Sequence, residues 1–210
     1  MPDNKQKTGQ WLSVLFYLQL CAIGLTLLNQ LSLTLQFSLG GSWITWVRRG
    51  VNIGIVACLF LLPGHYRPAA ASKGIWLVFS ILPSVLSLLF RPLGMDLYVL
   101  ISSITARITT VLALLALYLE YRAHADTGAA ADRSKWILLW TFNLVLTLGM
   151  NLLLPLLQDN LNTMLQNGIT WGLTVYNLIV LALTLTVDIL YLILLSRTVQ
   201  NARNEEHTYG

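Results

Sequence analysis

Six runs of mostly apolar residues divide the 210-residue sequence, and short polar or proline- and glycine-containing stretches separate them. A helix needs about 20 such residues to cross the roughly 30 Å hydrocarbon layer of a bilayer, because each residue adds 1.5 Å. Only 10% of the residues are charged, against about 25% in a typical soluble domain. The sequence therefore predicts an all-α, polytopic membrane protein, a bundle of six transmembrane helices. The predicted segments are 11–33, 43–62, 75–90, 97–119, 136–157 and 171–195.

The second segment has an ambiguous start, because Arg48 and Arg49 precede its strongest apolar run, residues 51–62. One possibility is a continuous helix from near Trp43 whose arginines extend toward water along their apolar stems. The alternative is that residues 41–50 lie along the membrane interface and the helix begins near Arg49. We favour the continuous helix.

The third segment, 75–90, is short and contains Pro83. Proline removes a backbone donor and usually kinks a helix. Membrane helices tolerate it, because neighbouring groups can satisfy the freed carbonyl. We therefore keep this segment as a transmembrane helix.

The basic residues predict the orientation of the bundle. With six spans, one side holds both termini and the 63–74 and 120–135 loops, and it carries nine Lys and Arg residues against three on the other side. Basic residues accumulate in cytoplasmic loops. We expect a cytoplasmic N-terminal segment (1–10), a transmembrane domain (11–195) and a cytoplasmic tail (196–210), in the cell membrane, most simply the inner membrane of a bacterium. The nine residues are Lys5, Lys7, Arg67, Lys73, Arg122, Arg133, Lys135, Arg197 and Arg203; the three are Arg48, Arg49 and Arg91.

Arg107 lies about ten residues from either end of the fourth segment. A charge at that depth costs at least about 2.5 kcal/mol when it faces lipid, so we expect it to face protein or water. The predicted partner is Asp188, the acidic residue that lies well inside the sixth segment. If both segments end at the same depth, the two residues are offset by about 8 Å. A long arginine side chain could close most of that distance.

Other polar residues repeat at helical spacing. Asn143, Thr147 and Asn151 follow an i, i+4, i+8 pattern, and Asn177 shares a face with Asp188. These groups are either interhelical hydrogen-bond partners, worth about 0.6 kcal/mol each, or the lining of a cavity that holds a solute or relays protons. The candidate ligand-binding residues are Arg107, Asp188, Asn143, Asn151, Gln19 and Asn177.

The leading functional hypothesis is binding or transport of a small solute through a polar cavity inside the bundle. The alternative is a non-transporting membrane subunit or regulator that binds another membrane protein. The sequence contains no HExxH motif and no glycine-rich phosphate loop, so we expect no enzyme activity, cofactor or metal site. Its basic residues fall in short pairs rather than in a stripe, which argues against nucleic-acid binding. The expected partners are the lipid bilayer and either a small solute or a membrane protein.

Overall fold

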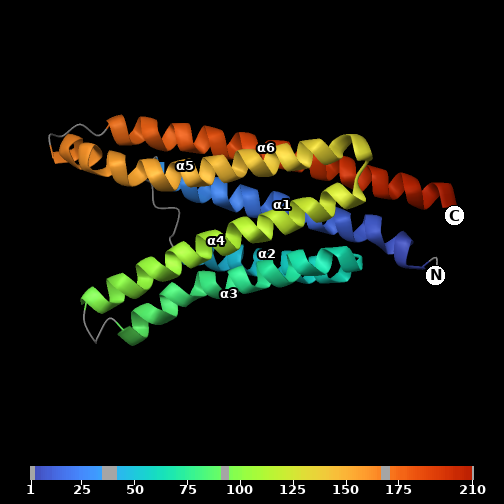
Figure 1. The fold of residues 1–210 in the computed structure, drawn as a ribbon, viewed down its shortest axis with the longest axis horizontal. Helices are drawn as coiled ribbons and strands as arrows, with labels where there is room; N and C mark the ends of the chain where they lie inside the picture. Colours follow the sequence, from blue (N-terminus) through green and yellow to red (C-terminus); the bar gives the residue numbers. More distant parts are fainter. Residues whose placement is uncertain (1–2, 35–41, 91–94, 167–170, 210) are drawn as a thin grey trace.

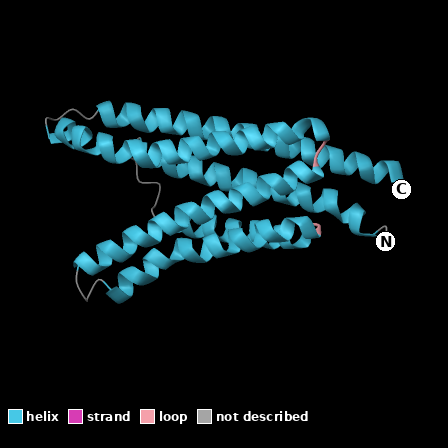
Figure 2. Ribbon diagram, in the orientation of Figure 1, coloured by secondary structure: helices cyan, strands magenta, loops and turns pink. Residues whose placement is uncertain are grey.

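The computed structural model describes residues 3–34, 42–90, 95–166 and 171–209, and their side chains over 7–32, 43–83, 85, 97–150 and 175–204. All regular structure in these ranges is helical (Figures 1 and 2), which confirms the all-α class. Two short 3₁₀ turns, η1 (Gly64–Tyr66) and η3 (Ala130–Asp132), join consecutive helices. The helices are α1 (Asp3–Thr34), α2 (Ser42–Leu61), α3 (Arg67–Phe90), α4 (Met95–Thr127), α5 (Arg133–Gln166) and α6 (Trp171–Tyr209).

The helices form two groups that meet near the chain termini. In one group α3 packs along α4 and α2 packs on α3, and in the other α6 packs along both α1 and α5. Both termini lie at the same end of the bundle, and the α3–α4 hairpin diverges from α5 and α6 toward the opposite end (Figure 1). The α1–α2 and α4–α5 contacts that join the two groups are at least as extensive as the α2–α3 and α5–α6 contacts within them, so the groups are distinguished by their divergence in Figure 1.

Five of the six helices are longer than the hydropathy predicts, and the extensions of α3 and α4 place charged residues inside the bundle. Helix α3 begins at Arg67 rather than near residue 75, and α4 continues to Thr127 rather than ending near residue 119. Residues assigned to the 63–74 and 120–135 loops are therefore largely helical. The predicted continuous second helix is confirmed, because α2 begins at Ser42.

Close packing at the end of α4 explains the glycine that follows it. The helix closes with a hydrogen bond of 2.8 Å from the Gly128 N–H to the His124 carbonyl. A Cβ atom at position 128 would lie 3.2 Å from Thr198 Oγ1 on α6. Such a contact is tighter than ordinary packing, so the absence of a side chain at Gly128 allows α4 and α6 to approach here.

Within the described residues, four helices contain a stretch long and apolar enough to cross a membrane: Lys7–Ser32, Trp43–Leu61, Leu97–Thr127 and Val175–Asn204. Large apolar side chains face outward on these and neighbouring helices, whereas several polar groups are buried. The core is still mainly apolar, but so many exposed large apolar side chains are unusual in a soluble domain and support membrane association. The prediction of six spans goes beyond these four helices and stays a prediction.

Candidate functional site

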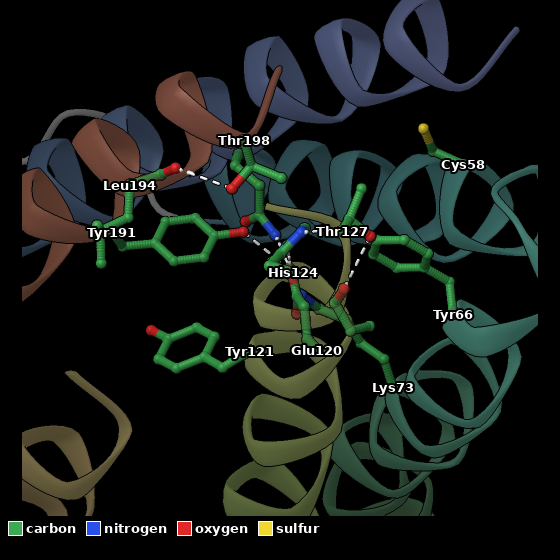
Figure 3. Close-up of polar contacts among 12 residues, drawn as sticks. Cys58, Tyr66, Lys73, Glu120, Tyr121, His124, Thr127, Tyr191, Leu194 and Thr198 are labelled. Atoms are coloured by element: carbon green, nitrogen blue, oxygen red, sulfur yellow. Dashed lines mark hydrogen bonds and ion pairs between the residues drawn. The ribbon is translucent and has the colours of Figure 1, made fainter. Parts of the chain in front are cut away.

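Glu120 of α4 is a buried charged residue, only 1% exposed. In the described part of the chain it accepts more side-chain hydrogen bonds than any other buried charged residue. Its Oε1 accepts hydrogen bonds from Gln19 Nε2 at 2.7 Å and from the Tyr191 hydroxyl at 2.9 Å. Its Oε2 accepts one from Lys73 Nζ at 2.5 Å, which is also an ion pair. Groups from α1, α3 and α6 thus converge on one carboxylate of α4 (Figure 3).

The helix extensions place the two charges of this pair inside the bundle. Lys73 lies in the second turn of α3, and Glu120 lies two turns before the end of α4. Arg122 and Asp126 of α4 point outward and are exposed, because two residues along a helix turn the side chain to the other face. The pair is electrically neutral, which a buried carboxylate needs, since an unpaired buried charge costs several kcal/mol.

A row of polar side chains leads from Glu120 to the surface. His124, one turn further along α4, has its Nε2 3.8 Å from Glu120 Oε1 and its Nδ1 3.0 Å from the Tyr66 hydroxyl. The Tyr66 hydroxyl lies 3.0 Å from Thr127 Oγ1, which lies 2.8 Å from Nε2 of the exposed His65. We call these five residues the relay. Only its step from Glu120 to His124 is longer than a hydrogen bond.

The outer end of the relay opens into a cleft of about 820 Å³ at the end of the bundle that holds the termini. His65 and Thr127 line this cleft together with the charged residues Lys7, Arg67 and Asp126. Burial raises the pKa of the Tyr66 phenol and lowers the pKa of His65. Tyr66 therefore keeps its proton, and His65 favours its neutral form, in which one ring nitrogen donates and the other accepts.

Aromatic rings shield the relay from the side of α5 and α6. Trp136 stacks on His124 with ring centroids 5.0 Å apart, and Tyr121 stacks on Tyr191 at 5.4 Å. Two buried nitrogens here, His124 Nε2 and Trp136 Nε1, make no hydrogen bond within the described side chains. A buried polar atom without a partner typically costs about 1–3 kcal/mol. These two nitrogens thus lack hydrogen-bond partners among the described side chains, in a site whose carboxylate, Glu120, already accepts three hydrogen bonds.

The sequence-predicted residues lie at different distances from this site. Gln19 belongs to it directly, and Asn143 Nδ2 lies next to it, donating to the Tyr121 hydroxyl at 3.3 Å. Asn177 is half-buried on α6. Asn151 lies on α5 but outside the residues whose side chains are described. Among the candidates whose side chains are described, Gln19 therefore belongs to the Glu120 cluster, and Asn143 and Asp188 lie near Tyr121 at its edge.

The predicted pairing of Arg107 with Asp188 requires a correction. The hydrogen bond between Tyr191 and Glu120 fixes the register of α6 against α4, two helices that run in the same direction. Arg107 precedes Glu120 by thirteen residues, about 20 Å, and Asp188 precedes Tyr191 by three, about 4.5 Å. The two are offset by about 15 Å, and no ion pair joins them among the described side chains. The offset was underestimated because α4 extends past the end that its hydropathy indicates.

Three central residues of the site, Lys73, Glu120 and His124, were absent from the sequence-predicted set. The i, i+4 spacing of Glu120 and His124, opposite the charges of Arg122 and Asp126, is the signal that could have indicated a continuing helix with a buried polar face. Within the described ranges, no three His, Cys, Asp or Glu side chains lie close enough to hold a metal ion. No family model, curated protein or solved structure matches this chain.

Proposed function

We propose that the chain is a multi-pass protein of the cell membrane, most simply the inner membrane of a bacterium. All six helices cross the bilayer, and both termini are cytoplasmic. The positions of the termini at one end of the bundle and the nine-to-three bias of basic residues support this topology. Reporter fusions at both termini and in the 158–170 segment test it. A cytoplasmic signal from the 158–170 segment would refute the topology.

We infer that the protein binds a small solute and transports it together with a proton. The observation that carries this inference is Glu120, a buried carboxylate that joins the two helix groups and lies at the inner end of the relay. Rows of acidic residues and histidines within membrane helices are typical of proton relays in transporters. The proposal assigns no catalytic chemistry to these residues.

Protonation of Glu120 supplies a physical reason for movement. Lys73 and Glu120 belong to the α2–α4 group, whereas Gln19 and Tyr191 belong to the other group, so the bonds to Gln19 and Tyr191 cross between the groups. Hydrogen bonds to a charged group contribute about 1.5–3 kcal/mol and neutral ones about 0.5–1.5 kcal/mol. A proton on Glu120 therefore weakens both crossing bonds, and the two groups can rock against each other, as halves of transporters do.

The same protonation releases a positive charge for the solute. Lys73 loses its counter-charge when Glu120 is neutral, and its side chain is 12% exposed, so a small movement opens it to a ligand. A small organic anion, such as a carboxylate, would restore the neutral pair. The relay delivers the proton from the cleft through His65, Thr127, Tyr66 and His124 in turn. Transfer to Glu120 requires His124 or Glu120 to move until the 3.8 Å step becomes a hydrogen bond.

Solute binding is tested first with purified protein. Small organic anions are screened for an increase in thermal stability, and each hit is added to vesicles that contain the reconstituted protein and a trapped pH dye. The wild type is expected to move protons when the solute is present. Tyr66→Phe removes only the relay hydroxyl, so it should bind the solute as tightly and move protons at least tenfold more slowly. Equal proton movement by both proteins, or no stabilising anion, would count against the proposal.

The rocking motion has a separate test. Spin labels at Val99 on α4 and Ile179 on α6, both exposed, are attached after Cys21 and Cys58 are replaced by alanine. Glu120→Gln mimics the protonated carboxyl, whereas the ion pair with Lys73 keeps Glu120 charged in the wild type at neutral pH. The distance between the labels should therefore differ between the variant and the wild type at the same pH. Equal distances in the two proteins would exclude the motion.

A second candidate function, partner binding, is favoured by the position of Arg107. This residue is exposed on α4, about 20 Å from the level of Glu120, on a helix apolar enough to cross the membrane. Contact with lipid at that depth costs at least about 2.5 kcal/mol, which an acidic or polar group of another membrane protein would remove. A photocrosslinker at exposed Val111, one turn away, tests this. This candidate would rank above transport if the crosslinker at Val111 captures a stoichiometric partner and Arg107→Gln abolishes that capture. A crosslinker at Val78 on α3 is the control and should capture no partner.

A further inference from the structure

A long groove runs along the outer face of the bundle between α5 and α6 and has a volume of about 760 Å³. Leu139 and Leu194 are buried at its base, whereas Leu138 and Val145 on its rim are 70% and 63% exposed. The groove is therefore a cleft with apolar walls that no described segment of the chain covers. Its lining consists of Lys135, Leu138, Leu139, Thr141, Phe142, Val145, Thr186, Leu190, Ile193, Leu194 and Arg197.

Both basic residues of the groove lie at the same end. Lys135 begins the lining on α5 and Arg197 ends it on α6, and these helices are antiparallel. Both side chains contact Asp132 Oδ1, with Arg197 Nη1 at 3.6 Å, yet each is about half exposed. The hydrogen bond from Lys135 lowers the pKa of Asp132, so this carboxylate stays charged. Two cations and one anion leave a net charge of +1 at the mouth of the groove.

The dimensions of the groove match one leaflet of a bilayer. Lys135 and Val145 are ten residues apart on α5, which corresponds to about 15 Å along the helix. Half of the roughly 30 Å hydrocarbon layer is also about 15 Å. The basic end lies toward the chain termini, the side that we propose to be cytoplasmic. A headgroup at Lys135 and Arg197 would place its acyl chain along the groove.

A second depression, of about 420 Å³, lies on the other side of α6, toward α1. Phe16, Ile189 and Leu192 line it, and it shares Ile193 and Arg197 with the first groove. The two depressions are therefore separated by a single row of α6 side chains that ends in an arginine. A molecule with two apolar chains and one anionic group fits this arrangement, one chain on each side of the row.

We propose that this face binds a phospholipid with an anionic headgroup from the cytoplasmic leaflet, its phosphate at Lys135 and Arg197. Basic pockets between membrane helices on the cytoplasmic side are typical sites for such lipids. The arginine fork suits a phosphate oxygen pair. The inference rests on the membrane placement proposed above but not on the proposed transport.

Native mass spectrometry of the detergent-purified protein tests the headgroup preference. The protein is incubated with an equimolar mixture of phosphatidylglycerol and phosphatidylcholine with identical acyl chains. One net positive charge near the headgroup should favour the anionic lipid about fivefold. Lys135→Gln with Arg197→Gln leaves Asp132 without a cation and a net charge of −1 at the mouth, so the ratio should fall to one or below. The matched control, Lys7→Gln with Arg67→Gln, removes the same charge from the cleft at the same end and should leave the ratio unchanged.

A second variant tests the groove itself. Val145→Trp fills the groove with a side chain that faces outward, so it should lower the number of bound lipids of both kinds severalfold while the protein stays folded. Wild type that binds both lipids equally, or the double variant that keeps the fivefold ratio, would overturn the lipid site and leave the proposed transport standing. Wild-type protein that does not insert into lipid vesicles at all would instead overturn the membrane placement.

Discussion

Removing the charge of Lys73 should destabilise this protein more than removing any charge at its surface. Lys73→Met leaves Glu120, only 1% exposed, without its cation. Breaking a buried pair in this way typically costs about 3–5 kcal/mol. The bonds from Gln19 and Tyr191 to Glu120 remain, so we expect the lower end, about 3 kcal/mol. For a chain of this length, 1 kcal/mol shifts Tm by about 2–4 °C, which gives a loss of about 6–12 °C.

The measurement is thermal unfolding in detergent micelles, followed by tryptophan fluorescence. Adding Glu120→Gln to Lys73→Met removes the uncompensated charge, so the double variant should be more stable than Lys73→Met alone. The matched control is Arg133→Gln, which removes one side of an exposed pair with Asp126 at 3.4 Å. Exposed pairs contribute at most about 1 kcal/mol, so its Tm should change by no more than about 4 °C.

Two results would refute this reasoning. If Lys73→Met shifts Tm no more than Arg133→Gln does, Glu120 is not ionised against Lys73 in the folded protein. If the losses of Lys73→Met and Glu120→Gln simply add, the two side chains are not energetically coupled. In either case protonation of Glu120 would no longer release Lys73 or weaken the bonds between the helix groups. The proposed coupling between proton and solute would lose its physical basis.

Three further predictions follow from other parts of the structure. Because about 15 Å separates Arg107 from Asp188 along the helices, the Tm losses of Arg107→Gln and Asp188→Asn should add, and partial rescue in the double variant would contradict the register. Gly128→Ala should lower stability by about 1 kcal/mol through contact with α6, whereas Gly149→Ala, where a Cβ meets nothing within 4 Å, should be neutral or stabilising. Since burial lowers the pKa of His65, the folded protein binds fewer protons there than the unfolded chain. Tm should therefore fall as the pH drops below about 6.5, and a pH titration of His65→Gln should show a flatter curve.

The sequence was sufficient to predict the all-α class and the approximate positions of the six helices. Apolar runs of about 20 residues have few alternatives to a helix, and the continuous second helix that we favoured despite Arg48 and Arg49 is the one that α2 forms. The helix ends were predicted less well. Hydropathy falls where charged residues begin, yet residues 120–127 contain neither glycine nor proline and can continue a helix in water. A membrane helix therefore ends later than its apolar segment does.

Because five of the six helices extend past their apolar segments, only those site residues that lie within an apolar segment could be predicted. Gln19 and Asn143 lie within apolar runs, where a polar residue is conspicuous, and both were identified. Lys73 and Glu120 lie only one or two residues beyond the predicted apolar segments, where charges are expected on any membrane protein. Their burial follows from the packing of α3, α4 and α6 beside one another, which local sequence patterns do not specify.

The relay depends on contacts that are still more distant in sequence. Tyr66 lies in the turn between α2 and α3, and it reaches His124 only because that turn packs against the last turns of α4. A tyrosine and a histidine at adjacent helix ends are ordinary interfacial residues when considered one by one. Their significance comes from their place in a row of five polar side chains that begins at a buried carboxylate and ends at a solvent cleft. Tyr66→Phe removes the hydroxyl and keeps the buried ring. The variant therefore tests whether these residues conduct protons or only pack at the ends of neighbouring helices.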